Sequence, residues 1–225
     1  MNERGGHRAA SMGRPRACGI VAACLLLVFA AGEAAAGPAT DQLRGAIDRV
    51  VKTMEDSRFQ GSGKAGARRA AVRKIADEIF DFGEIARRAL GRHWQARTDK
   101  EQAEFVGLFG DLLERSYISK IEVYGGEKIL YANEKADGDR VTVGTKVITK
   151  TGTEVPIDYR MLKRGERWLV YDVNIEGVSL VSNYRTQFNK IIQTSSYAEL
   201  VRKMKARQDE IAGGGEAPGA GKSKN

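Results

Sequence analysis

Several segments of the sequence match the spacing of catalytic or ligand-binding motifs, so their surroundings have to be weighed. Residues 61–66 read GSGKAG, which fits the G-x-G-x-x-G pattern of dinucleotide-binding loops. That chemistry needs a strand before the glycines, because the helix after them must present its N-terminus to a pyrophosphate. A helical pattern precedes these glycines instead. We therefore predict a flexible connection between two helices.

A catalytic triad or a zinc site would need histidine, and the sequence contains little of it. Ser179 lies in GVSLV, which has the first half of a nucleophile elbow and lacks its closing glycine. After residue 36 the sequence contains one histidine, His93, so a Ser-His-acid triad or a zinc site would have to use it. We predict that Ser179 is a helix N-cap and that His93 packs near a helix end. No catalytic residue, metal or cofactor is predicted.

Two neighbouring pairs, Asp158 with Tyr159 and Tyr171 with Asp172, have the types needed for acid and base catalysis in a cavity. Adjacent residues of a strand point to opposite faces, so neither pair converges on one substrate. We therefore predict that the protein is not an enzyme, and that the aspartates pair with cations such as Arg160.

Length and charge narrow the class of protein. The 225 residues are 42% hydrophobic and 29% charged, which predicts one domain or two small ones and excludes disorder throughout. The net charge is +8, and basic residues cluster within 68–74 and 202–207. Neither cluster is interleaved with the aromatic residues that stack on nucleic-acid bases, so we predict no nucleic-acid partner. The clusters are either solvated faces or docks for an anionic membrane or protein.

Residues 1–36 are predicted to be a secretory signal peptide. Arginines up to Arg16 precede an apolar run over 17–31, and the segment ends in Ala34-Ala35-Ala36. The run of about 15 residues is shorter than the ~20 that span a bilayer. An uncleaved anchor and lipidation of Cys24 are the alternatives. Cleavage would remove both cysteines and leave a chain with net charge +6, which must be stabilised by burial of a core.

The elements follow from hydrophobic periodicity. Apolar positions recur every three or four residues over 41–57, 72–80 and 82–90, and Thr98 with Glu101 forms a capping box for a long helix. Beyond residue 126 the period becomes two, and short turn sequences divide this region into four segments. Helical spacing returns after Gly177, and a second capping box, at Ser196 and Glu199, begins a last helix.

These elements predict an α+β fold with a four-stranded antiparallel twisted sheet covered by about six helices. We expect one domain over 37–211 and a disordered tail over 212–225, where no large apolar residue occurs. The last strand is predicted to turn Leu169, Tyr171, Val173 and Ile175 to the apolar face. The polar face is predicted to carry Lys146, Asp158, Arg160 and Asp172.

The segment 168–188, WLVYDVNIEGVSLVSNYRTQF, strongly resembles the MlaC, or toluene-tolerance, family. Phe80-Asp-Phe82, Ala89-Leu-Gly-x-x-Trp94 and Pro156-Ile-Asp-Tyr-Arg160 agree with the same pattern, and the likeness runs from about residue 41 to 207. The resemblance implies an NTF2-like sheet with helices closing over a lipid-tail pocket. It also implies a periplasmic phospholipid carrier, expected to be a monomer, that moves lipid between an outer-membrane lipoprotein complex and an inner-membrane MCE-domain ABC transporter. Relatives in hopanoid gene clusters make a polycyclic lipid the alternative cargo.

A lipid carrier must hide acyl chains from water. At ~0.8 kcal/mol per CH₂, two tails of about 16 carbons are worth roughly 25 kcal/mol, which requires an enclosed pocket. Arg160 or Arg185 is predicted to meet the phosphate, although Asp158 or Asp172 competes for either guanidinium. The predicted chain-contacting residues are Phe105, Phe109, Leu112, Val143, Val147, Tyr159, Tyr171, Val173, Tyr184 and Phe188. The same side chains would equally form a packed core, and then the protein would be a non-carrier adaptor between envelope complexes.

Overall fold

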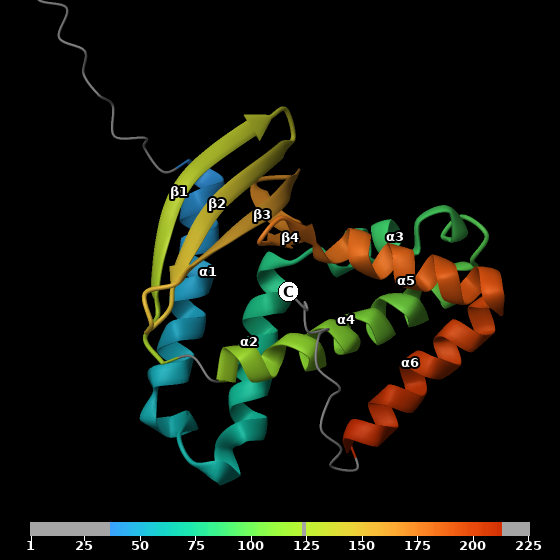
Figure 1. The fold of residues 1–225 in the computed structure, drawn as a ribbon, viewed down its shortest axis with the longest axis horizontal. Coiled ribbons are helices and arrows are strands. Elements are labelled where there is room, and N and C mark those ends of the chain that lie inside the picture. Colours follow the sequence, from blue (N-terminus) through green and yellow to red (C-terminus); the bar gives the residue numbers. More distant parts are fainter. Residues whose placement is uncertain (1–36, 123–124, 213–225) are drawn as a thin grey trace, which may run out of the picture. The chain divides into compact units, whose positions relative to one another are not determined.

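The computed structural model describes residues 37–122 and 125–212, which form six α-helices and five strands (Figure 1). The helices are α1 Pro38–Glu55, α2 Ala65–Ile79, α3 Phe82–Leu90, α4 Asp99–Glu122, α5 Leu180–Thr194 and α6 Tyr197–Ala212. The strands are β1 Lys128–Asp137, β2 Arg140–Ile148, β3 Glu154–Arg164, β4 Arg167–Ile175 and β5 Val178–Ser179. The predicted signal peptide and residues 213–225 of the predicted tail lie outside the described residues. No helix within the described ranges combines the length and the hydrophobicity needed to cross a bilayer.

The sheet is an antiparallel meander in the order β1-β2-β3-β4-β5, which confirms the predicted α+β class. The fifth strand, absent from the prediction, has two residues and pairs Ser179 with Asn174. Gly138 and Gly165 have φ values of 56° and 61° in two-residue turns between strands, a conformation that glycine adopts without strain. The predicted capping box is confirmed, because the Thr98 N–H donates to Glu101 at 2.8 Å and the Glu101 N–H donates to the Thr98 hydroxyl at 3.3 Å.

A bulge in β4 changes which of its residues face the core. Arg160 pairs with Asp172 while the next residue, Met161, pairs with Val170, so Tyr171 is an extra residue in the strand. Val170 is fully buried and Leu169 lies on the opposite face. The predicted row through Leu169 and Tyr171 was therefore wrong, because one extra residue exchanges the two faces of a strand.

Two apolar clusters form the core. The sheet cluster joins α1 and α2 to the sheet, and its buried members are Ala39, Leu43, Ala46, Ile75, Ile79, Val141, Val143, Met161 and Val170. The helical cluster joins α3, α4, α5 and α6, and its buried members are Ile85, Ala86, Ala89, Leu90, Phe105, Leu108, Phe109, Val181, Phe188, Leu200 and Met204. Phe80, between α2 and α3, packs against both clusters.

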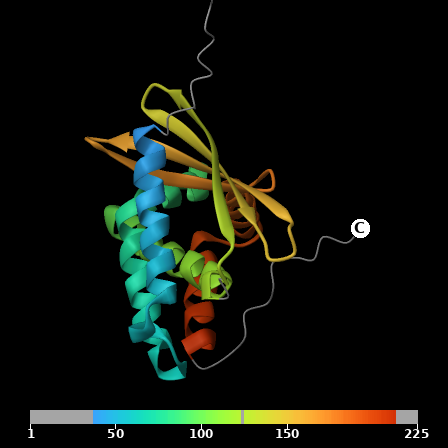
Figure 2. The ribbon, with the colours of Figure 1, turned by 90° about the vertical axis from the view of Figure 1, so that its left-hand side faces the viewer.

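Polar contacts hold α1 across the sheet, beside α2 (Figure 2). The Glu134 carboxylate of β1 accepts hydrogen bonds from the backbone N–H and the hydroxyl of Thr40, at 2.8 and 2.5 Å. The Gln42 side chain donates to the Trp168 carbonyl and accepts from the Trp168 N–H at 3.0 Å. Strands β1 and β4 therefore both bind the first two turns of α1. These contacts fix the helix over the sheet cluster.

The bulge can be tested by shortening two neighbouring side chains. We expect Val170→Ala to lower the free energy of unfolding by about 2 kcal/mol, because it empties space in a fully buried site. Leu169→Ala removes more atoms from a half-buried site and should cost less than half as much. Denaturant unfolding of the two variants measures both values. A larger loss for Leu169→Ala would contradict the register across β3 and β4.

Candidate functional site

A cavity of about 310 Å³ lies where α3 and α5 meet β3 and β4. We call it the basic cavity, and its lining residues are Arg88, Arg160, Tyr171, Asp172, Val181, Ser182 and Arg185. Val181 also belongs to the helical cluster, so the cavity opens next to apolar side chains. Three arginines against one aspartate give the lining a net positive charge, which suits an anionic ligand.

Asp172 is the buried anchor of this cavity. Its side chain is 5% exposed, and its carboxylate accepts hydrogen bonds from Arg160 Nη1 at 3.0 Å, Ser179 Oγ at 2.7 Å and the Val181 N–H at 3.1 Å. Ser179 in turn accepts from the Ser182 N–H at 3.0 Å, which confirms it as the N-cap of α5. The predicted polar-face residue Asp172 is thus on the predicted face but covered by the first turn of α5.

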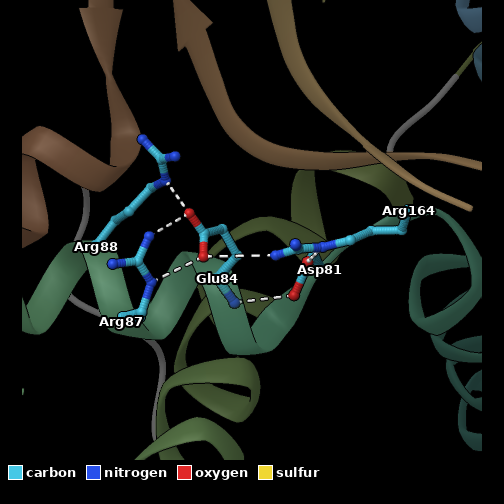
Figure 3. A network of polar contacts seen from close by, with 5 residues as sticks. All are labelled: Asp81, Glu84, Arg87, Arg88 and Arg164. Carbon is cyan, nitrogen blue, oxygen red and sulfur yellow. Dashed lines mark hydrogen bonds and ion pairs between the residues drawn. The ribbon is translucent and has the colours of Figure 1, made fainter. Parts of the chain in front are cut away.

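Arg88 reaches the basic cavity from α3. Its Nε donates to Glu84 at 2.6 Å, and its guanidinium lies 4.1 Å from the centre of the Tyr171 ring. The hydrogen bond from Nε to Glu84 and the contact between the guanidinium and the Tyr171 ring fix the orientation of Arg88. Its two terminal nitrogens point away from Glu84 (Figure 3).

Glu84 is the centre of a network that holds Arg88 (Figure 3). It is 7% exposed and also accepts two hydrogen bonds from Arg87, at 2.8 and 2.6 Å, while Arg164 of β3 lies 3.7 Å away. The hydrogen bonds from Arg87 and Arg88 lower the pKa of the Glu84 carboxyl to about 2, although its desolvation acts in the opposite direction. Asp81 caps α3 by accepting from the Glu84 N–H at 2.9 Å.

Sequence reasoning missed Arg88 and this network. The signal was nevertheless present, because Glu84, Arg87 and Arg88 have the i, i+3 and i, i+4 spacing of ion pairs on one helix. The spacing does not reveal that Arg88 faces a cavity while Arg87 does not. That difference depends on how α3 is rotated against β4.

The structure places both predicted headgroup residues in one cavity. Arg160 and Arg185 line the basic cavity, and so does Tyr171. Arg160 is paired with Asp172, whereas the Arg185 Nη2 donates to the Ser182 hydroxyl at 3.2 Å. Within residues 37–122 and 125–212 no carboxylate lies at ion-pair distance from Arg185. Whether either arginine binds phosphate stays a prediction.

The other predicted lipid-binding residues divide between the two clusters. The helical cluster contains Phe105, Phe109, Leu112, Tyr184 and Phe188. The centre of the Phe109 ring lies 5.1 Å from the centre of the Tyr184 ring and 5.1 Å from that of Phe188. The sheet cluster contains Val143, Tyr159 and Val173. Val147 is half-buried and is a member of neither cluster as described. The structure therefore does not gather the predicted set around one space.

One Asp–Tyr pair is separated as predicted and the other is not. Because of the bulge at Tyr171, Tyr171 and Asp172 both line the basic cavity, so the prediction that neither pair converges on one space was wrong for this pair. Asp158 is exposed on the face of β3 opposite to Tyr159, which packs against the sheet cluster. Burial raises the pKa of Tyr159 to about 12, so the phenol is neutral at physiological pH and is a poor base. No group of three or more potential metal ligands occurs within the described part of the chain.

The chain is similar to known proteins over most of its length. The model of the MlaC protein family matches residues 44–206, a range that contains every lining residue of the basic cavity. The toluene tolerance protein ttg2D of Pseudomonas putida is 25% identical over 171 residues, which cover 75% of this chain and 80% of that protein. The intermembrane phospholipid transport system binding protein MlaC of Haemophilus influenzae is 25% identical over 122 residues, which cover 52% of this chain and 57% of that protein.

A solved structure is also similar. It is that of a phospholipid-binding protein from Ralstonia solanacearum in complex with a phospholipid. It matches with a TM-score of 0.68 and 27% sequence identity, and the match covers 78% of this chain and 99% of that chain.

The Glu84 network predicts a pH-dependent contribution to stability. We expect Glu84→Gln to lower the free energy of unfolding by about 2 kcal/mol at pH 7, because an amide binds the two arginines less strongly. The folded-state pKa of about 2 lies below the ordinary value of 4.5, so the carboxylate stabilises the fold above about pH 4.5. That stabilisation is lost as the pH falls towards 2. Urea unfolding of both proteins across this range measures it, and a difference that stays constant down to pH 2 would contradict the network.

Proposed function

Because the chain belongs to the MlaC protein family, we propose that it binds a phospholipid and carries it through the periplasm. Its similarity to a protein solved with a bound phospholipid is the observation that carries this proposal. The predicted signal peptide of residues 1–36 would direct the chain to that compartment. The proposed partners are an outer-membrane lipoprotein complex and an inner-membrane ABC transporter with an MCE-domain subunit.

The basic cavity is the proposed site of the phosphate. Arg88, Arg160 and Arg185 reach it from α3, β3 and α5, so their donors converge from three elements. Guanidinium groups bind phosphate oxygens through paired, charge-assisted hydrogen bonds. Of the three, Arg160 is paired with Asp172, Arg88 shares the single charge of Glu84 with Arg87, and Arg185 has no carboxylate at ion-pair distance among the described residues. Arg185 therefore supplies the charge that a phosphate would balance.

The acyl chains require more room than this cavity has. Its volume of about 310 Å³ is at the lower end of the ~300–1,000 Å³ of ligand pockets, and it suits a headgroup. The cavity lies between α5 and the sheet, and Val181 connects it to the helical cluster. We propose that the chains enter between the helical cluster and the sheet cluster, which meet at Phe80. Burial of two tails, worth roughly 25 kcal/mol, would offset the separation of side chains that this requires.

Both walls of that space would come from predicted residues. Phe105, Phe109, Leu112, Tyr184 and Phe188 would form the helical wall. Val143, Tyr159 and Val173 lie on the face of the sheet opposite to Asp172, so the chains would reach them only beyond Phe80. Two members of the predicted set lie outside these walls. Val147 is near the end of β2, and Tyr171 lines the basic cavity.

Lipid carried by the protein is the direct test. We expect native mass spectrometry of the chain purified from the cell envelope to show a bound phospholipid, which collisional activation releases. Protein recovered without lipid should take it up from vesicles, because burial of the chains drives loading. Failure in both experiments would contradict the proposal and would fit the packed-core adaptor instead.

The proposed phosphate site can be tested with a matched pair of variants on one helix. Arg87 and Arg88 both donate to Glu84 at 2.6 Å, but only Arg88 lines the basic cavity, and Arg87 is 48% exposed. We expect Arg88→Gln to weaken the binding of vesicle-derived phospholipid roughly tenfold, the effect of losing one charge-assisted hydrogen bond. Arg87→Gln should change it less than twofold, as measured by partition between protein and vesicles. Equal losses in the two variants would show that Arg88 acts only through the stability of α3.

A further inference from the structure

On the basis of the proposed function, we propose that the headgroup site selects phospholipids with a net negative charge over zwitterionic ones that carry an ammonium group. Two observations support this selectivity. A second cavity adjoins Arg185, and the hydrogen-bond acceptors described below in the two cavities are already bound by protein donors.

A second cavity lies further along α5 and shares Arg185 with the basic cavity. Its volume is about 210 Å³, and Arg185 lines both spaces. Its other lining residues include Arg92 and His93, which follow α3, and Asn189 on α5. A headgroup whose phosphate meets Arg185 would therefore place its terminal group beside further basic side chains.

The acceptors on this surface are already engaged. Asp172 is the one carboxylate among the described residues that line either cavity, and its oxygens are bound by Arg160, Ser179 and Val181. The Ser182 hydroxyl accepts from Arg185 at 3.2 Å. An ammonium group would find no available carboxylate in either space.

The polar groups of the second cavity are similarly committed. The Asn189 Oδ1 lies 3.0 Å from His93 Nε2, and its amide nitrogen donates to Gln193 at 3.0 Å. Asp158 is the acidic residue nearest in sequence to Arg160 on the same strand face, and it lines neither cavity. A terminal ammonium would therefore meet Arg92 and Arg185, and like charges in a partly enclosed site repel. A headgroup of phosphate with a glycerol, or of phosphate alone, avoids this repulsion.

A competition experiment measures the selectivity. The full exported chain is incubated with vesicles that contain equal amounts of phosphatidylglycerol and phosphatidylethanolamine with identical acyl chains, and the bound lipids are identified by mass spectrometry. We expect phosphatidylglycerol to be enriched about fivefold or more on the wild-type protein. Arg185→Gln should bring the ratio of bound lipids close to that of the vesicles and, because Arg185 is part of the proposed phosphate site, lower the total amount of bound lipid as well.

Lys190→Gln is the matched control. It removes the same charge from the same helix, but Lys190 is exposed and lines neither cavity. If the enrichment arose only because a positively charged protein collects on anionic vesicles, the two variants would lose it equally, and the proposal would be overturned.

The remaining outcomes separate this inference from the proposed function. Binding of both lipids at the vesicle ratio would overturn the selectivity and leave the carrier function intact. Binding of neither lipid would overturn both. Inorganic phosphate is titrated separately by calorimetry without vesicles. Arg185-dependent binding of phosphate, together with an unselective lipid ratio, would assign the cavities to free phosphate and would also overturn the proposal.

Discussion

The burial of one carboxylate, that of Asp172, determines how the helical half of the protein meets the sheet. A buried carboxylate is stable only when its oxygens are bound, and here they are bound by β3, by the turn before α5 and by the first turn of α5 itself. The start of α5 is thereby fixed on the face of the sheet opposite to α1. Because α5 packs with α3 and α6, the position of the whole helical cluster against the sheet depends on this contact.

The same contact creates the basic cavity. With α5 held at β4, its second turn brings Arg185 next to Arg160, and α3 brings Arg88 over Tyr171. Three guanidinium groups placed together would repel one another strongly if none were neutralised. Asp172 pairs with Arg160, and Glu84 offsets part of the charge of Arg88, which it shares with Arg87, so that the charge of Arg185 remains for a ligand. The cavity is thus a stable arrangement of cations that still favours an anion.

The division of the core into two clusters bears on the proposed entry of acyl chains. A single continuous core would resist the insertion of acyl chains, because every displaced contact would be shared by the whole domain. In this protein the sheet cluster and the helical cluster each have their own buried residues, and Phe80 is packed against both. Separation at this boundary leaves the hydrogen bonds of the sheet and of the helices intact. The cavity with the arginines lies where the sheet and α5 already meet, and Val181 belongs both to its lining and to the helical cluster.

The sequence by itself determined the elements and their order. Apolar periods, the Thr98 capping box and glycines in the turns act locally, and the structure has helices and strands where they predicted them. Arg160 and Arg185 were the two candidates for the headgroup site in the sequence, and both line one cavity. Only the tertiary structure decided which residues face it. The bulge at Tyr171 exchanges the faces of β4, and the rotation of α3 separates Arg88 from Arg87, because both depend on contacts between elements that no local pattern encodes.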